Sequence, residues 1–247
     1  MQFALVENVV SEPKPGLNGT CKCCGTPMVP KCGRHKIWHW AHKSLVHCDS
    51  WWETETAWHR GWKNKFNKEW HEIIHFDTET GEKHIADVKT DRGLIVEFQH
   101  SAMKFEELES REQFYKNMVW IVDGCRSDQN AFLFDQGLAG PISVNPDTYS
   151  LQWFGSSKIF EDWMQATKPV FLDFGSENLW RLVSFNSATK KGVVELIGRE
   201  CLVGDITEGR PLAQIGPAEL SSNLTPPLPP QADSPQLSLW AGGPGLK

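Results

Sequence analysis

The sequence lacks any long apolar run, any basic leader segment and any overall excess of positive charge. No stretch approaches the roughly 20 apolar residues that a membrane-spanning helix needs, so we expect no association with a membrane. The segment MQFALVENVVSEPKPG has neither a basic region nor a long apolar stretch, so we find no signal peptide and expect a cytoplasmic protein. A length of 247 residues is enough for one good core and a smaller unit.

The formal net charge of −6 is not typical of a nucleic-acid-binding protein, but the average hides a local bias. From Lys31 to Lys68 the sequence has eight Lys or Arg residues and three acids. Such a patch can hold phosphates, although a solvated basic face gives the same pattern. Six of the twelve tryptophans lie in this region. We expect most of them in the core, and one or two could stack on bases.

Five of the seven cysteines lie between Cys21 and Cys48, in a segment that also contains histidines. In a cytoplasmic chain such a cluster predicts a metal site rather than disulfides. Cys21 and Cys24 form a CxxC pair, and structural zinc needs four ligands from short segments. The expected zinc ligands are Cys21, Cys24, His42 and either Cys48 or His39. Cys32 is a spare candidate, Cys23 is not expected to bind, and buried thiols without metal are the alternative.

The spacing of apolar residues predicts helices and short strands. A helix is expected over residues 50–72, with Ser50 as its N-cap and Glu53 completing a capping box. A second helix is expected over residues 104–117. Strands are expected over residues 3–10, 73–76, 84–90, 94–101 and 118–124, and further along over residues 150–154, 169–175, 179–185 and 193–198. The order helix, strand, strand, strand, helix, strand indicates an α/β fold with a mixed sheet.

Changes in composition and in the pattern of predicted elements divide the chain into four predicted parts. An N-terminal strand and the Cys/His segment occupy residues 1–49, and the α/β core occupies residues 50–145. A small β-rich subdomain is expected over residues 146–215. Residues 216–247 are rich in Pro, Ser and Gly and cannot build a core, so we expect a disordered tail.

The candidate active-site residues lie on the strands predicted over residues 84–90 and 94–101. Side chains two apart on a strand share a face, so Asp87 points with Lys89, and Glu97 points with Gln99. A carboxylate within an apolar strand is costly unless it is paired or binds a metal. Acids on adjacent strands suit Mg²⁺, which takes oxygen ligands. Charges at a sheet edge, with no metal, are the alternative.

A third acid comes from the predicted first helix. Glu55, His59 and Lys63 are spaced four apart, so they share a helix face. If this face packs on the two strands, Glu55 completes an acidic triad with Asp87 and Glu97. Exposed helix charges are the alternative, and a core histidine bonded to a backbone group is the alternative for His59.

The motifs that surround these residues are long and specific. HxAH, CDSWWExExxWHRxWK, HIADVKT, GLIVEFQHS and REQFYKNMVWIVDG resemble the competence-protein CoiA-like family, densely over residues 20–125 and loosely to residue 183. HWAH stands where that family usually has HFAH. The family is regarded as a branch of the PD-(D/E)xK nuclease superfamily. The resemblance therefore implies a restriction-endonuclease-like mixed-sheet core and hydrolysis of DNA that depends on Mg²⁺ or Mn²⁺, in repair, recombination or replication-associated processing.

The resemblance also implies residue roles. Glu55 matches the acid of the first core helix, Asp87 the motif aspartate, and Glu97 with Gln99 the (D/E)xK pair. Asp87 and Glu97 would bind the catalytic metal, and all four residues would be catalytic. The residues expected to support the site or to contact phosphate are His59, Lys63, Lys89, Arg111 and Tyr115, with Gln113 on the same helix as the last two.

Gln99 departs from the family pattern, which has lysine. A glutamine can orient water but cannot supply positive charge, for which Lys89 or a second metal could partly substitute. The alternative function is a catalytically weak DNA-binding or DNA-processing accessory protein that uses this fold as a scaffold.

The tail carries a second motif. It resembles the peptide Gln-Leu-(Ser/Asp)-Leu-Phe, by which many bacterial DNA-repair and replication proteins bind the polymerase sliding clamp, and consists of Gln236, Leu237, Ser238, Leu239 and Trp240. Leu239 and Trp240 would fill an apolar pocket, with Gln236 at its rim. The Pro-rich stretch before them would act as an extended tether that raises the local concentration of the nuclease. A tail that folds back on its own domain is the alternative.

Overall fold

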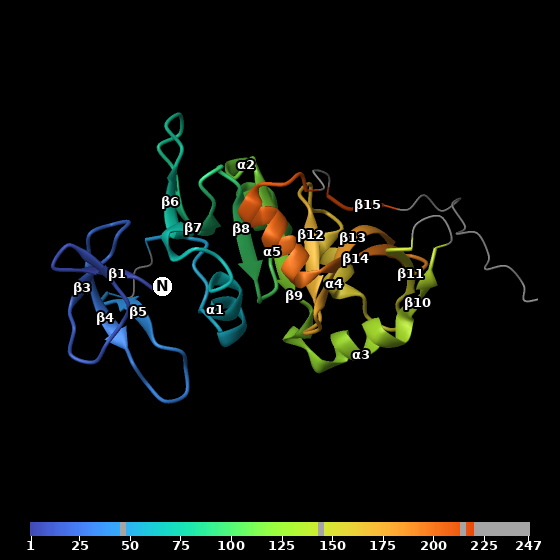
Figure 1. The fold of residues 1–247 in the computed structure, drawn as a ribbon, viewed down its shortest axis with the longest axis horizontal. Helices are drawn as coiled ribbons and strands as arrows, with labels where there is room; N and C mark the ends of the chain where they lie inside the picture. The colour runs from blue at the N-terminus through green and yellow to red at the C-terminus, as the bar shows by residue number, and fades with distance from the viewer. Residues whose placement is uncertain (45–47, 143–145, 213–215, 220–247) are drawn as a thin grey trace, which may run out of the picture.

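The computed structural model describes residues 1–44, 48–142, 146–212 and 216–219. It contains a small antiparallel sheet with the order β2-β1-β3-β4-β5 and a large mixed sheet with the order β10-β11-β14-β13-β12-β9-β8-β7-β6, to which β15 is paired through β13. Figure 1 shows the small sheet at one end of the molecule, beside β6 and β7, and β10 and β11 at the other end. The prediction of an α/β fold with a mixed sheet is confirmed.

The small sheet holds the Cys/His segment. Its strands are β1 (Ala4–Val6), β2 (Val9–Ser11), β3 (Gly19–Thr20), β4 (Pro27–Lys31) and β5 (His39–His42). The single strand predicted over residues 3–10 is wrong, because Glu7 and Asn8 both have positive φ and form the turn of a β1–β2 hairpin. A small core under this sheet is built on Trp40, which is fully buried. A side chain at Gly19 would lie 3.1 Å from the Trp40 ring and 3.0 Å from the Ala4 side chain, so a larger residue there would need its neighbours to shift.

The centre of the large sheet has the predicted order of elements. The chain runs from α1 (Ala57–Lys63) and a 3-10 turn, η1 (Lys68–Trp70), through β6 (His71–Phe76), β7 (Lys83–Lys89) and β8 (Ile95–Gln99) to α2 (Phe105–Phe114) and β9 (Met118–Asp123). β6, β7 and β8 are antiparallel neighbours, and β9 is parallel to β8. Every residue of β8 and of β9 is buried, as expected for apolar strands covered on both faces.

The first helix is shorter than predicted and begins later. Thr56, not Ser50, is the N-cap, and its hydroxyl accepts the His59 amide at 3.2 Å. Residues 50–56 form no helix, since Glu53 and Glu55 are used in tertiary contacts of the site described below. The last part of the predicted helix is occupied by η1 and the start of β6.

Residues beyond β9 extend the same sheet. After η2 (Gly124–Arg126), the elements are α3 (Asp128–Gly137), β10 (Leu138–Pro141), β11 (Thr148–Gln152), α4 (Lys158–Trp163), β12 (Val170–Asp173), β13 (Asn178–Asn186), β14 (Lys191–Gly198), α5 (Arg199–Glu208) and β15 (Ala218–Glu219). β12 is parallel to β9, so the strands within residues 146–212 continue the sheet of the core. The register places Asp173 opposite Asp123 at the ends of these two strands.

Helices cover both faces of the large sheet. One apolar cluster includes Leu108 of α2, Phe134 of α3 and Phe160 of α4, and the other includes Trp62 of α1 and Leu202 of α5. Among the described residues, none of the helices is both long enough and apolar enough to span a bilayer.

Candidate functional site

The candidate site lies where β7 and β8 separate. Backbone pairing joins Val88 to Val96 and Lys89 to Ile95, and the same register places Asp87 opposite Glu97. At Asp87 and Glu97, backbone amides of one strand donate hydrogen bonds to side-chain carboxylates of the other strand instead of to backbone carbonyls. The Asp87 amide donates to Glu97 Oε1 at 3.1 Å, and the Phe98 amide donates to Asp87 Oδ2 at 3.0 Å. Each carboxylate therefore occupies the position of a ladder carbonyl, and the two strands are held apart around a pocket.

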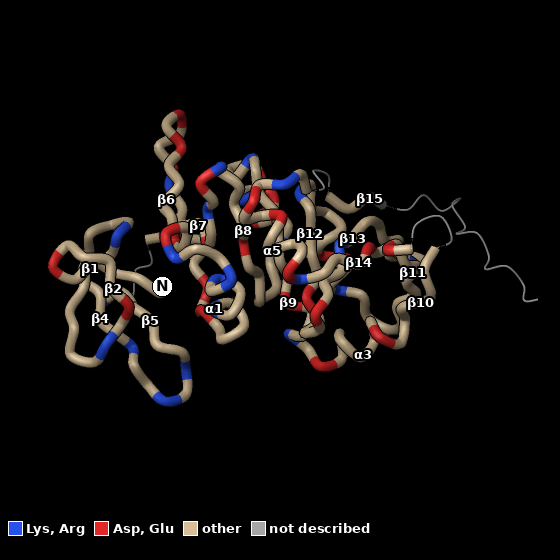
Figure 2. Tube along the Cα trace, viewed as in Figure 1, with Lys and Arg blue, Asp and Glu red and all other residues tan. Residues whose placement is uncertain are grey.

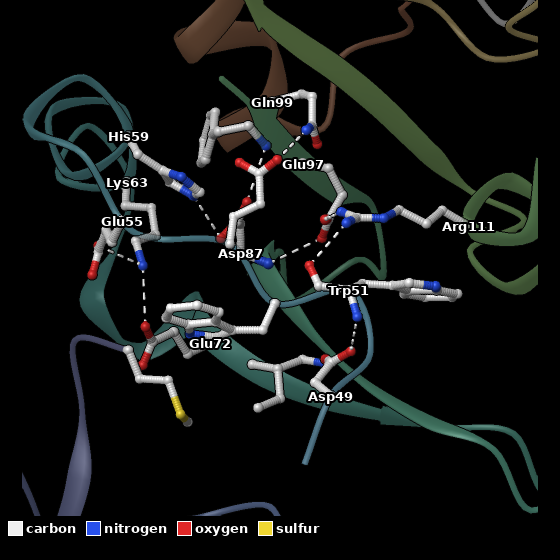
Figure 3. A pocket seen from close by; sticks show the side chains of 15 residues that line it. Asp49, Trp51, Glu55, His59, Lys63, Glu72, Asp87, Glu97, Gln99 and Arg111 are labelled. Carbon is white, nitrogen blue, oxygen red and sulfur yellow. Dashed lines mark hydrogen bonds and ion pairs between the residues drawn. The ribbon is translucent and has the colours of Figure 1, made fainter. Parts of the chain in front are cut away.

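The pocket has a volume of about 70 Å³, enough for a few waters or a hydrated cation. It combines the two acids with side chains from α1, from β6 and from residues 49–55. The remaining lining residues are Met1, Asp49, Trp51, Trp52, Glu53, Glu55, His59, Lys63, Glu72, Ile85, Phe98, Gln99 and Arg111. Figure 3 shows Asp87 near the centre, with His59 on one side and Glu97 on the other.

Asp87 is paired with the first helix. His59 Nε2 lies 2.8 Å from Asp87 Oδ1, and the histidine is buried. Burial raises the pKa of Asp87, but the His59 imidazole, Lys63 and the Phe98 amide outweigh it and lower the pKa below its ordinary value. Asp87 is therefore held as a carboxylate inside the protein.

Glu97 is in a different electrostatic state. Its side chain is only 6% exposed, and Arg111 Nη1 lies 3.2 Å from Glu97 Oε2. Burial, together with the nearby negative charge of Asp87, raises the pKa of Glu97 to about 8 in spite of Arg111. Asp87 is thus the ionised member of the pair, and ionisation of Glu97 is opposed because its burial and the negative charge of Asp87 disfavour a second carboxylate in the same pocket.

Glu55 lines the pocket, but its carboxylate is already bonded to basic side chains and is not free to act as a metal ligand. Its carboxylate accepts two hydrogen bonds from Arg60, each at 2.7 Å, and lies 2.8 Å from Lys63 Nζ. The Lys63 side chain is 2% exposed and is also 3.1 Å from Glu72. These cations lower the pKa of Glu55, although burial alone would raise it. The predicted proximity of Glu55 and Lys63 is present, while the third residue of that set, His59, points to Asp87.

Other predicted residues differ in their distance from the pocket. Gln99 lines it, and its amide nitrogen donates to the Ser101 carbonyl at 3.1 Å and to the Glu53 carboxylate. Lys89 Nζ bonds to His75 Nδ1 at 3.0 Å and does not line the pocket.

Two residues of the region after β8 were also predicted to support the site. Tyr115 is buried, burial raises the pKa of its phenol, and its hydroxyl has no hydrogen-bond partner among the described residues. Gln113 is exposed on α2.

Two acids of the site carry no signal that the sequence patterns detect. Asp49 accepts the Ile85 amide at 2.7 Å and bonds to His84 Nδ1 at 2.8 Å, so it fixes β7 two residues before Asp87. Glu72 has a positive φ of 50° and accepts the backbone amides of Gln2 and Phe3 at 2.5 and 3.0 Å. Asp49 immediately follows Cys48, inside the motif CDSWWE, and that neighbourhood is the only hint of its role.

A second cluster lies on the small sheet. Cys21, Cys24, His42 and Cys48 place their ligand atoms within 4.8 Å of one another. Cys21 Sγ is 3.7 Å from Cys48 Sγ, and Cys24 Sγ is 3.5 Å from His42 Nε2. A tetrahedral zinc with Zn–S bonds of about 2.3 Å and Zn–N bonds of about 2.0 Å has two sulfur ligands about 3.8 Å apart. In the same geometry a sulfur and a nitrogen ligand are about 3.5 Å apart. The donor set and both distances therefore fit zinc, and this cluster could hold such a metal.

The cluster resolves the choice of the fourth zinc ligand. Cys48 belongs to it, whereas His39 bonds to the Ile37 carbonyl at 2.9 Å through Nδ1. Cys23 and Cys32 are outside the cluster. Gly25 has a φ of +71° and its amide donates to the Cys21 carbonyl at 2.9 Å, which closes the turn between the first two cysteines.

Comparisons with protein-family models, with curated proteins and with solved structures find no match to this chain. The family suggested by the sequence motifs therefore stays a prediction. The predicted clamp-binding motif, residues 236–240, lies outside the described residues.

Proposed function

We propose that this protein is a metal-dependent DNA nuclease with a restriction-endonuclease-like, PD-(D/E)xK core of the CoiA-like type. The observation that carries the proposal is the pair Asp87 and Glu97, which face each other on separating strands, with the pKa of Asp87 lowered and that of Glu97 raised. The succession α1, β6, β7, β8, α2, β9, with β8 parallel to β9, supports the assignment of the core. Buried acids whose pKa values are pushed apart in this way are more typical of catalytic centres than of structural ion pairs.

Asp87 and Glu97 are the residues that would hold Mg²⁺ or Mn²⁺. Such cations bind one or two carboxylates together with waters and substrate phosphate, and the pocket has room for them. When bound, the cation would lower the pKa of a water molecule and stabilise charge on the phosphate. A bound cation would also offset the burial and the negative charge of Asp87, which together raise the pKa of Glu97.

The protein's own side chains have assignable roles around this pair. His59 keeps Asp87 in place and ionised, and Arg111 keeps Glu97 in place. Gln99 is anchored through its amide nitrogen, so its carbonyl oxygen is left to accept a hydrogen bond from a water and to orient it. Glu55 holds Lys63 and Arg60 at the pocket, and we assign it to the electrostatic wall of the site.

A cleavage panel tests the proposal. Purified zinc-loaded protein is mixed with single-stranded, duplex and branched DNA, with and without Mg²⁺ or Mn²⁺. We expect cation-dependent cleavage that falls by on the order of 100-fold or more in Asp87→Asn and Glu97→Gln. Glu109→Gln, which removes an exposed acid of α2, is the matched control and keeps full activity. Absence of cleavage in every combination refutes the nuclease proposal.

A second candidate function is a DNA-binding accessory protein that uses this fold without cleaving. The observation that favours it is that the acids already have protein partners. His59 is paired with Asp87, Arg111 is paired with Glu97, and Gln99 stands where the family pattern has lysine. This candidate predicts DNA binding of unchanged affinity in Asp87→Asn and no cleavage by any variant.

We also propose that the tail delivers the protein to the polymerase sliding clamp. The support is the sequence of residues 236–240 at the end of a Pro-rich stretch. Leu239→Ala together with Trp240→Ala should abolish co-elution with a bacterial clamp and leave cleavage of free DNA unchanged. Retained co-elution of the double variant contradicts the proposal.

A further inference from the structure

The small sheet differs in charge from the rest of the molecule. From Pro13 to Cys48 the sequence has six Lys or Arg residues and no Asp or Glu, although the whole chain has a net charge of −6. The zinc-binding prediction accounts for Cys21, Cys24, His42 and Cys48 of this segment but leaves its basic residues without a role. A region that is uniformly positive on an acidic protein attracts polyanions locally.

Two of these six basic residues lie on one loop. Residues 32–38 connect β4 to β5, and Arg34, His35 and Lys36 are exposed at its tip. The ion pairs found within the described part of the chain engage neither Arg34 nor Lys36. Figure 2 shows this loop projecting from the small sheet beside α1, with Lys and Arg along it.

Trp38 adds an aromatic surface to the same loop. Its side chain is 46% exposed, and its indole Nε1 donates to the Gly33 carbonyl at 3.2 Å. The ring is therefore held in a fixed position at the surface. Exposed aromatic rings placed among basic side chains are the combination that binds single-stranded nucleic acid, because phosphates meet the cations and unpaired bases stack on the ring.

The loop is connected to the candidate active site through one arginine. Arg60 Nη2 donates to the Trp38 carbonyl at 3.3 Å, and the same guanidinium holds the pocket residue Glu55. Arg60 lies on α1 next to His59, which contacts Asp87. A strand bound on the loop would therefore lie beside the helix that lines the pocket.

We infer that residues 32–38 form a DNA-binding loop, on which Arg34 and Lys36 contact phosphates and Trp38 stacks on an unpaired base. The choice of DNA as the polyanion rests on the proposed nuclease function. The candidate zinc cluster gives the loop a rigid base, since its ligands lie on β5, at the turn before β4 and after β5. Because bases in a duplex are already stacked on each other, the loop favours single-stranded DNA over duplex DNA.

Fluorescence anisotropy tests this inference on the zinc-loaded full chain, with no Mg²⁺ or Mn²⁺ added. The probes are a labelled single-stranded DNA oligonucleotide and the duplex of the same sequence, each titrated over a series of NaCl concentrations. Arg34→Ser with Lys36→Ser should reduce the slope of log affinity against log salt by about 1.4, the value for two phosphates on a single strand. Trp38→Ala should weaken binding of the single strand at least about fivefold while the slope stays that of the wild type.

Lys116→Ser with Lys191→Ser is the matched control, because it removes two exposed positive charges from the part of the chain that forms the large sheet. It should bind like the wild type. Zinc content and thermal unfolding of each variant establish that the fold is retained. Wild-type affinity and slope in the loop variants, an equal loss in the control, or a loss seen with the duplex alone would each overturn the inference.

The outcome is separable from that of the nuclease proposal. Cleavage is measured independently with Mg²⁺ or Mn²⁺. A protein that cleaves nothing but loses single-strand binding in the loop variants refutes the nuclease and retains the loop. A protein that cleaves normally and whose loop variants bind like the wild type refutes the loop and retains the nuclease.

Discussion

Replacing Glu97 with Gln should change how the stability of the metal-free protein depends on pH. Burial and Asp87 raise the pKa of Glu97 from its ordinary value of 4.5 to about 8. The native state therefore holds the proton more tightly than the unfolded chain, and stability is lost as pH rises from 4.5 through about 8. At about 1.4 kcal/mol per pH unit, this one group accounts for a loss of at most about 5 kcal/mol over that window.

Glutamine has the shape of the protonated carboxyl group but cannot ionise. Glu97→Gln should therefore have nearly the stability of the wild type at pH 5 and exceed it increasingly towards pH 8. The assay is urea unfolding at pH 5, 6, 7 and 8 in buffer without Mg²⁺ or Mn²⁺, with zinc content checked at each pH. Glu109→Gln, at an exposed position, should follow the wild type throughout. Parallel pH profiles of the wild type and Glu97→Gln would refute the argument that burial and Asp87 raise the pKa of Glu97.

Three further perturbations test separate parts of the structure. Asp49→Ala leaves three groups without their hydrogen-bond partner, the His84 ring and the amides of Ile85 and Trp51, so it should lower the free energy of unfolding by about 1–3 kcal/mol in urea titrations while zinc content stays constant. Cys24→Ser should lose bound zinc and unfold at a lower temperature, whereas Cys32→Ser should keep its zinc, as measured by atomic spectroscopy on the purified protein. Lys63→Met leaves two buried carboxylates without their shared cation and should cost about 3–5 kcal/mol, while Lys65→Met, which breaks an exposed ion pair, should change stability by less than about 1 kcal/mol.

The sequence was a good guide to the order of elements in the centre of the large sheet. Apolar strands such as β8 and β9 are marked by composition, and the tight turn between β7 and β8 is marked by residues 91–93. The helix prediction failed at its beginning. Trp51 and Glu55 have helical spacing with Trp58, but their backbone lies outside the helix because the tertiary contacts of residues 49–55 compete with helix formation.

The residues of the candidate site were predictable only where their spacing along a strand or a helix also brings them together in the fold. Asp87 and Glu97 share a pocket because the register of two strands places them together. Glu72 gave no signal, since its carboxylate is bound to amides that are about seventy residues away in the chain. The choice between His39 and Cys48 was open for another reason. Spacing along the chain does not give the direction in which a side chain points.

The boundary between the two sheets has a consequence for how this protein can evolve. Asp49 follows a candidate zinc ligand and fixes β7, and Glu72 of β6 binds amides that precede β1. Each part thus supplies an acid or an amide that the other part needs. An N-terminal segment exchanged by recombination would therefore need an acid at the position of Asp49. The amides that Glu72 binds are backbone groups, so the incoming segment would need to place its backbone there but would be free in the side chains at those two positions.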